Sequence, residues 1–182
     1  NIAGKNSSFC ELTGLYWAWQ NGIFKNNQYV GLVHYRRYFA GKELYLKKRH
    51  IASESELLSL LEKYDAILPK KRNYFIESIY SHYQHAHYVK DLNCTREIIS
   101  ELHPEYITSF DAIMQGRKIH IYNMFVMSSE TASEYCQWLF PILFELEKRI
   151  DITQYDNYQK RVFGFIAERL FNVWLVHHQL KF

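Results

Sequence analysis

Short apolar runs alternate with longer helical segments along this chain, and this alternation constrains the fold more than any other feature. Three runs are typical of buried strands: residues 29–34, 64–68 and 118–127. Segments with helical spacing and caps lie around them. The predicted helices cover residues 9–21, 53–61, 79–92, 95–102, 104–116, 129–149 and 155–178. Strands that alternate with helices predict a layered α/β fold with a mainly parallel sheet and a helix-rich C-terminal half.

Two serine-glutamate pairs have the spacing of a capping box. In each pair the glutamate follows the serine by three residues, as in Ser8 with Glu11 and Ser53 with Glu56. A helix is therefore expected to begin at each serine.

The length of 182 residues predicts one domain, covering residues 1–182. Three strands are few for so many helices, and the chain begins with Asn1 in a loop-like segment. We therefore expect a single domain that lacks its N-terminal strand.

The charge and cysteine content exclude several classes of protein. A net charge of +3 is too small for a duplex-binding surface. Residues 34–39 mix aromatic and basic side chains, as in single-strand binders, but the near-neutral charge argues against a nucleic-acid partner. The three isolated cysteines favour a reducing compartment, and neither a signal peptide nor an apolar run of about 18 residues occurs. A cytoplasmic protein is expected.

The segment His34-Tyr35-Arg36-Arg37 directly follows a predicted buried strand. In open α/β sheets, ligands bind outside the carboxyl ends of the strands. The planar donors of Arg36 and Arg37 suit phosphate oxygens. Binding of a phosphate group and surface ion pairing are both open interpretations of this arginine pair.

A second candidate is the stripe of Tyr83, His87 and Asp91, which would share one helix face at a spacing of four residues. There Asp91 could orient His87. A polar helix flank without a site is the alternative. The pair His82 and His85 could bind a metal, but no further ligand stands at a suitable spacing, so no metal site is predicted.

Polar residues inside apolar segments supply the remaining candidates. Asn123 interrupts the third strand, and its amide must find a partner there or face a ligand. In the last helix, a polar stripe is formed by Arg161, Gly164, Glu168 and Asn172. Glu168 could be a general base in a desolvated site, or it could dock the helix through a network with Arg161 and Arg169.

Several segments together resemble one bacterial family, and they cover nearly the whole chain. These segments are Asn1-Ile2 with Lys5-Asn6, residues 10–19, 30–39 and 65–69, Tyr83 with His87 and Asp91-Leu92, and residues 122–125 and 164–170. The family comprises uncharacterised glycosyltransferase-type proteins found with capsular and exopolysaccharide synthesis. Its most specific segment here is His-Tyr-Arg-Arg-Tyr-Phe at 34–39.

The resemblance implies a single Rossmann-like nucleotide-sugar transferase domain of the GT-A-like kind. Many such enzymes carry an Asp-x-Asp metal motif, which this chain lacks. We therefore expect no cofactor and metal-independent transfer, with Arg36 and Arg37 stabilising the departing diphosphate. A divalent metal ion in that role is the alternative to the arginines. The alternative is a non-catalytic module that binds a carbohydrate or nucleotide.

The resemblance also suggests roles for individual residues and partners. Glu168 is the expected base, with His87 second. The expected donor-binding residues are His34, Tyr35, Arg36, Arg37 and Asn123, and the expected acceptor-binding residues are Tyr83, Asp91, Arg161 and Arg169. The expected partners are a nucleotide-sugar and a saccharide or lipid-linked saccharide acceptor. Loose association with the inner face of the plasma membrane is a further expectation, assisted by the basic segment 42–49.

Overall fold

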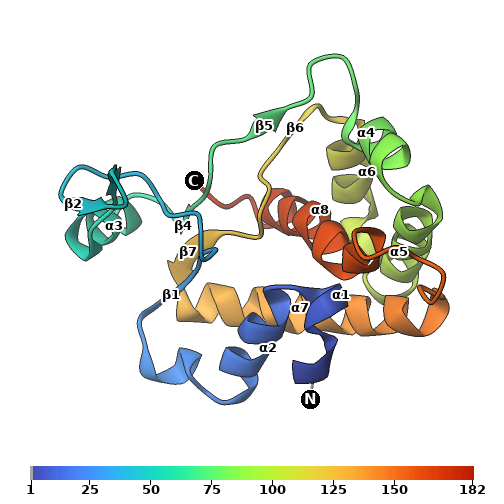
Figure 1. The fold of residues 1–182 in the computed structure, drawn as a ribbon, viewed down its shortest axis with the longest axis horizontal. Helices are drawn as coiled ribbons and strands as arrows, with labels where there is room; N and C mark the ends of the chain where they lie inside the picture. The colour runs from blue at the N-terminus through green and yellow to red at the C-terminus, as the bar shows by residue number, and fades with distance from the viewer. Residues whose placement is uncertain (1) are drawn as a thin grey trace.

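The computed structural model describes residues 2–182, so Asn1, part of the family resemblance, lies outside the described residues (Figure 1). Over this range the α-helices are α1 (Asn6–Phe9), α2 (Leu12–Gln20), α3 (Glu54–Leu61), α4 (Ile79–Ala86), α5 (Val89–Leu102), α6 (Ile107–Gln115), α7 (Ser129–Arg149) and α8 (Val162–His177). The strands are β1 (Tyr29–Leu32), β2 (Leu44–Leu46), β3 (Arg49–Ile51), β4 (Ala66–Ile67), β5 (Arg72–Asn73), β6 (Lys118–Ile119) and β7 (Phe125–Ser128). The fold is mixed α/β and rich in helices, in agreement with the predicted class.

The main sheet has the order β1-β7-β4, and both pairings are antiparallel. The prediction of a mainly parallel sheet was wrong, because apolar runs identify strands but not their direction. Tyr29 pairs with Ser128 and Leu32 with Phe125. The carboxyl end of β1 therefore meets the amino end of β7, which brings His34 beside Tyr122.

The predicted third strand is divided in two. After β6 the chain turns through Tyr122 and Asn123, whose φ angles of 79° and 51° are left-handed, and only then enters β7. Such φ angles cost a side chain steric strain, and strained residues of this kind cluster at functional sites. The apolar composition of residues 118–127 concealed this turn.

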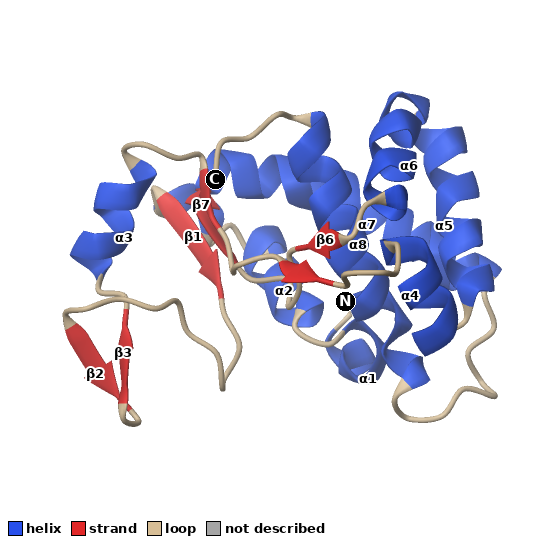
Figure 2. Ribbon diagram, turned by 90° about the horizontal axis from the view of Figure 1, so that it is seen from above, coloured by secondary structure: helices blue, strands red, loops and turns tan. Residues whose placement is uncertain are grey.

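Two β-pairs were not predicted. The hairpin of β2 and β3 lies in a segment for which no strand was predicted, and β5 pairs with β6. In Figures 1 and 2 the hairpin and α3 lie together, apart from the helical body formed by α4 to α8.

The core lies between the two long helices and the elements around them. Helix α7 contacts α2, α5, α8, β1 and β7, and α8 also contacts α1 and α6. Twelve of the residues of α8 are buried, as expected for a helix that is apolar on nearly all sides. This burial fixes the position of the polar residues that α8 carries toward the sheet.

Of the two predicted capping boxes, the structure contains one and contradicts the other. Ser53 accepts from the N–H of Glu56, and the reciprocal bond is also present, so this box is confirmed. The box at Ser8 was wrong: α1 ends at Phe9 because Cys10 has a left-handed φ of 51°. The Glu11 side chain is therefore free of capping and turns elsewhere.

Gly164 lies inside α8 because Cys10 approaches it closely. A Cβ at this position would lie 3.3 Å from Cys10 Sγ and 3.5 Å from Cys10 Cβ. The side chain of Cys10 thus packs directly on the backbone of α8 at Gly164. Gly14 in α2, in contrast, has no atom within 4 Å of such a Cβ.

This difference predicts opposite outcomes for the same substitution at two helical glycines. Gly14→Ala should raise the free energy of unfolding by about 1 kcal/mol, the difference in helix propensity. Gly164→Ala has the same propensity gain, but crowding against Cys10 should offset it by about 1 kcal/mol or more. Urea unfolding of both variants measures the difference, and equal stabilisation would contradict the packing at Cys10.

Among residues 2–182, none of the helices combines the length and apolar character needed to cross a bilayer.

Candidate functional site

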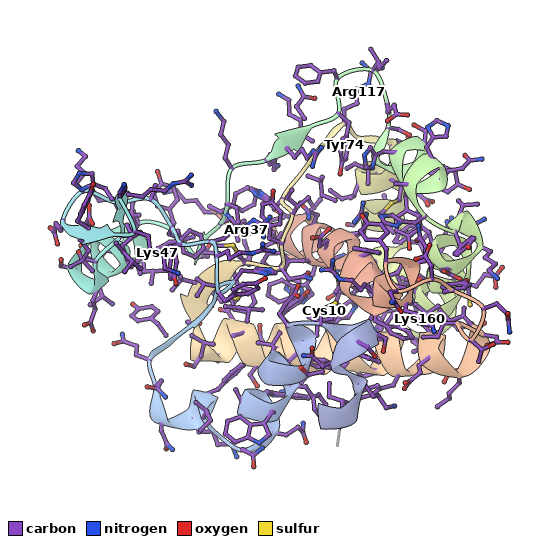
Figure 3. All side chains as sticks on the ribbon, in the orientation of Figure 1. Cys10, Arg37, Lys47, Tyr74, Arg117 and Lys160 are labelled. Carbon is purple, nitrogen blue, oxygen red and sulfur yellow. The ribbon has the colours of Figure 1, made fainter. Side chains whose placement is uncertain are left out.

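A cavity of about 480 Å³ opens at the end of the sheet where β1 finishes and β7 begins. Its walls come from segments far apart in the chain, and Figure 3 shows Cys10, Arg37 and Tyr74 around this region. The lining residues are Cys10, Glu11, His34, Tyr35, Arg36, Arg37, Arg72, Tyr74, His82, His87, Ile121, Tyr122, Tyr158, Arg161, Gly164, Phe165, Glu168 and Arg169.

Arginines dominate the charge of this cavity. The five arginines are Arg36, Arg37, Arg72, Arg161 and Arg169, whereas the carboxylates are Glu11 and Glu168. Within residues 2–182, no ion pair engages the first four of these guanidinium groups. The cavity is therefore suited to a ligand with at least two negative charges.

Arg36 and Arg37 are positioned by a tight turn after β1. The N–H of Arg37 donates to the carbonyl of His34 at 3.1 Å, which closes this turn. The Arg37 guanidinium lies over the ring of Tyr122, 4.0 Å from its centroid, and that of Arg36 lies 4.7 Å from the Tyr35 centroid. Stacking orients both groups while their N–H donors stay available to a ligand.

A network around Asn123 holds one wall of the cavity. Its Nδ2 donates to Glu11 Oε1 at 2.7 Å and to the carbonyl of Gly164 at 3.2 Å. His34 Nε2 donates to the carbonyl of Tyr122 at 2.7 Å and lies 3.7 Å from Glu11 Oε1. Asn123 is only 4% exposed and stands behind the wall, so it positions Glu11.

Glu168 lies at the base of the cavity with a side chain that is 17% exposed. Oε1 accepts from the N–H of Tyr122 at 2.8 Å, and Oε2 accepts from Arg169 Nη1 at 2.9 Å. Burial raises the pKa of the Glu168 carboxyl, against the opposing effects of Arg169 and the Tyr122 N–H. A raised pKa makes this carboxylate a better proton acceptor than a surface glutamate.

His87 ends α4 and packs against Phe165, with ring centroids 4.2 Å apart. The amide nitrogen of Gln159 donates to Ala86, so its oxygen faces His87 and accepts from Nδ1 at 3.1 Å. Burial lowers the pKa of His87 to about 4. The ring is therefore neutral at pH 7, and its Nε2 can accept a hydrogen bond from a ligand.

The predicted stripe of Tyr83, His87 and Asp91 is not formed, because the helix breaks at His87 and Tyr88. Tyr83 is fully buried beneath Arg169, whose guanidinium lies 5.0 Å from its ring centroid. Asp91 is 1% exposed and accepts from the hydroxyl of Tyr155 at 2.9 Å. Their predicted contact with a sugar conflicts with this placement.

Asn123, predicted to bind the donor, does not line the cavity, whereas the other predicted residues meet there. These are His34, Tyr35, Arg36, Arg37, His87, Arg161, Glu168 and Arg169. Arg161 donates to Cys10 Sγ at 3.3 Å and not to Glu168. Of the suggested network of Arg161, Glu168 and Arg169, only the ion pair between Arg169 and Glu168 is present.

Sequence reasoning missed several lining residues. Arg72 and Tyr74 come from β5 and the loop after it, a segment in which no site residue was predicted. Tyr74 stacks on His82 with centroids 3.8 Å apart, and both line the cavity. Glu11 was assigned to a helix cap. A basic pair directly before Arg72 was the available signal, because Lys70-Lys71-Arg72 follows a strand just as Arg36-Arg37 does.

A second cavity, of about 540 Å³, shares Arg36, Arg37 and Tyr122 with the first. Its other walls come from the β2–β3 hairpin and from Pro69 and Met124. The two arginines therefore stand between two cavities.

The cavity residues do not fit a divalent metal ion. In the part of the chain that the structure describes, no group of three or more His, Cys, Asp and Glu side chains could hold one. Glu11 already accepts a hydrogen bond from Asn123, and Glu168 accepts one from Arg169. Metal-independent chemistry stays a prediction that chelation can test.

Comparison with known proteins places these observations in context. A family model described as "Domain of unknown function (DUF4422)" matches residues 1–179. The solved apo structure of WbbM, a bifunctional glycosyltransferase, is similar with a TM-score of 0.86 and 31% sequence identity. That match covers 100% of this chain and 37% of the WbbM chain. A comparison with curated proteins found no match.

Proposed function

The chain belongs to the DUF4422 family, and on this premise we propose that it is a glycosyltransferase domain. It transfers a sugar from a nucleotide-sugar donor to a saccharide acceptor, in the synthesis of a capsular or extracellular polysaccharide. The similarity to a bifunctional glycosyltransferase supports a glycosyltransferase-like function. The donor, the acceptor and the pathway belong to the proposal.

The observation that carries this proposal is the set of five arginines around a cavity that also holds a buried carboxylate. A nucleotide-sugar presents a diphosphate with two negative charges, and guanidinium groups bind such oxygens through paired N–H donors. Arg36 and Arg37 are the proposed diphosphate ligands because stacking on Tyr35 and Tyr122 orients them.

The arginines have a chemical role as well as a binding role. As the bond from the anomeric carbon to the diphosphate oxygen breaks, negative charge grows on the leaving group. Fixed positive groups aimed at that charge stabilise the transition state more than the ground state. In this way Arg36 and Arg37 would replace the metal ion of related transferases.

Glu168 is the proposed base for the acceptor hydroxyl in an inverting reaction. Its carboxylate would take the hydroxyl proton as the acceptor oxygen attacks the anomeric carbon, and Arg169 and the Tyr122 N–H hold it in place. Neutral His87 would accept a hydrogen bond from a sugar hydroxyl through Nε2. Arg161 and Arg169 remain proposed ligands of the acceptor side.

The direct test is an assay of donor turnover with and without a chelator. We expect the chain, supplied with a panel of nucleotide-sugars and oligosaccharide acceptors, to release nucleotide diphosphate and to retain activity in EDTA. Loss of activity in EDTA that Mn²⁺ or Mg²⁺ restores would contradict the metal-independent route.

A non-catalytic module that binds a carbohydrate or nucleotide is the second candidate. It would use the same arginines and tyrosines, and it would bind a nucleotide-sugar without turnover. Calorimetric titration beside the turnover assay distinguishes the two, because saturable binding without release of nucleotide diphosphate or transfer would favour the module.

A further inference from the structure

A basic ribbon with an apolar tip stands beside the candidate site. Its strands are β5 and β6, with Arg72 paired to Ile119 and Asn73 to Lys118. Figure 1 shows them along the upper edge of the molecule, joined to α4 by a loop at the top. We call this element the basic ribbon. It comprises Lys70, Lys71, Arg72, Arg117, Lys118 and the tip residues Phe75 and Ile76.

The tip exposes two large apolar side chains. Ile76 is 88% exposed and Phe75 is 73% exposed, so both stand almost entirely in water. Water-exposed apolar side chains of this size in adjacent positions are typical of a contact surface. Within residues 2–182, nothing covers them.

The turn that presents this tip is held by hydrogen bonds. Asn73 Oδ1 accepts from the N–H of Phe75 at 2.9 Å, and the carbonyl of Tyr74 accepts from the N–H of Ile76 at 2.8 Å. Phe75 adopts a left-handed φ of 59° in this turn. The tip is therefore preorganised, which reduces the entropy lost when it inserts into a partner.

The basic side chains of the ribbon are exposed and uncompensated. Among the described residues, Lys70, Lys71, Arg72, Arg117 and Lys118 form no ion pair. Figure 3 places Arg117 at the upper edge, above Tyr74, whose N–H donates to the Arg117 carbonyl at 2.8 Å. The nearby carboxylate, Glu77, is bound to His85 Nδ1 at 2.6 Å.

We propose that the basic ribbon docks this domain on an anionic phospholipid surface. The cations meet the lipid phosphates, and Phe75 and Ile76 enter the boundary between headgroups and acyl chains. A protein partner with an acidic, apolar surface is the less favoured occupant, because a small tip surrounded by dispersed cations offers little area for a protein interface.

Docking would bring the cavity close to the membrane. Arg72 and Tyr74 belong to the ribbon segment and also line the cavity. A ribbon on the lipid surface would therefore set one cavity wall beside the headgroups. The docking itself does not depend on the proposed transferase activity.

The sequence pointed instead to the segment 42–49, which forms most of the β2–β3 hairpin. That hairpin also exposes apolar residues, with Leu44 at 48% and Tyr45 at 66%. However, Glu43 and Glu56 lie at its base, where the Glu56 carboxylate accepts from the N–H of Lys42 at 2.8 Å. Each tip residue of the ribbon is more exposed than any apolar residue of the hairpin, and the ribbon has no glutamate of its own, so the ribbon is the better docking element.

Vesicle co-sedimentation tests the proposal. The chain should bind vesicles that contain roughly 30% phosphatidylglycerol in phosphatidylcholine and should not bind pure phosphatidylcholine. Phe75→Ser/Ile76→Ser and Lys71→Gln/Lys118→Gln should each weaken this binding by about tenfold or more. Circular dichroism confirms that the variants are folded.

The hairpin supplies matched controls. Leu44→Ser/Tyr45→Ser and Lys47→Gln/Lys48→Gln should bind like the unchanged chain. The proposal is overturned if the unchanged chain does not bind anionic vesicles, or if the hairpin variants lose binding and the ribbon variants keep it. It is also overturned if Phe75→Ser/Ile76→Ser turns a dimer into a monomer without changing vesicle binding, since the occupant is then a second copy. Turnover of a water-soluble acceptor should be unchanged in Lys71→Gln/Lys118→Gln, which separates this result from the proposed function.

Discussion

Replacing Arg37 by alanine is expected to lower kcat/KM for sugar transfer by about 100- to 1000-fold, the usual loss when one fixed group leaves a developing negative charge. Arg37 lies between the two cavities and stacks on Tyr122. Its guanidinium is exposed, so truncation leaves no buried charge without a partner. Stability should fall by only about 1 kcal/mol, the value of the lost stacking. Steady-state kinetics and urea unfolding measure the two effects separately.

Three variants control this prediction. Arg36→Ala should show a loss of the same kind, because Arg36 lines the same two cavities. Arg37→Lys keeps the charge but loses the paired donors, so we expect intermediate activity. Arg96→Ala removes an exposed arginine that pairs with Asp111, and its activity should be unchanged. An Arg37→Ala enzyme that is unfolded, or one with full activity, would contradict a role in stabilising the leaving group.

The second large effect is expected for Glu168→Gln. Glutamine has the same shape and can still accept from the Tyr122 N–H, but it cannot take a proton from the acceptor. The transfer rate should fall by about 100- to 10,000-fold, while the donor dissociation constant changes only a few-fold. Because the amide is neutral, the Arg169 guanidinium loses its ion pair, and the free energy of unfolding should fall by about 1–3 kcal/mol.

Two readouts separate a base from a docking residue. The activity of the unchanged enzyme should fall with acidification as the Glu168 carboxylate is protonated, which gives the pH–activity profile an acidic limb. The residual activity of Glu168→Gln should lack this limb. Because burial raises the pKa of Glu168, the limb should lie above the usual range of a glutamate. NMR of the product should show an inverted anomeric centre. Retention of configuration, or full activity in the variant, would contradict the base role.

Much of the fold could be predicted from local sequence signals. Ser53 with Glu56 marks a helix start, Gly116 follows α6, and residues 129–149 form α7 as expected. These features depend on side chains within a few residues of one another. The same is true of β1, whose apolar run ends at the arginine pair.

The parts that could not be predicted depend on contacts between distant segments. Apolar residues in 118–127 conceal the turn at Tyr122 and Asn123, because its strain is supported by Glu11, Glu168 and His34. The sequence assigns Glu11 to a helix cap, but in the structure α1 ends before it, with Cys10 as the C-cap. The sequence pairs Asp91 with His87 on one helix face, but in the structure α4 ends at Ala86 and Asp91 belongs to α5.

The turn at Tyr122 and Asn123 also has a consequence for when the site can exist during folding. Its hydrogen bonds reach partners 88 residues away at His34, 112 away at Glu11 and 46 away at Glu168. Contacts of such high sequence separation form late, because each closes a long loop against chain entropy. During synthesis, the residues through α8 must therefore leave the ribosome before the pocket can take shape. A fragment that ends before α8 would lack Glu168, which supports the turn through the N–H of Tyr122.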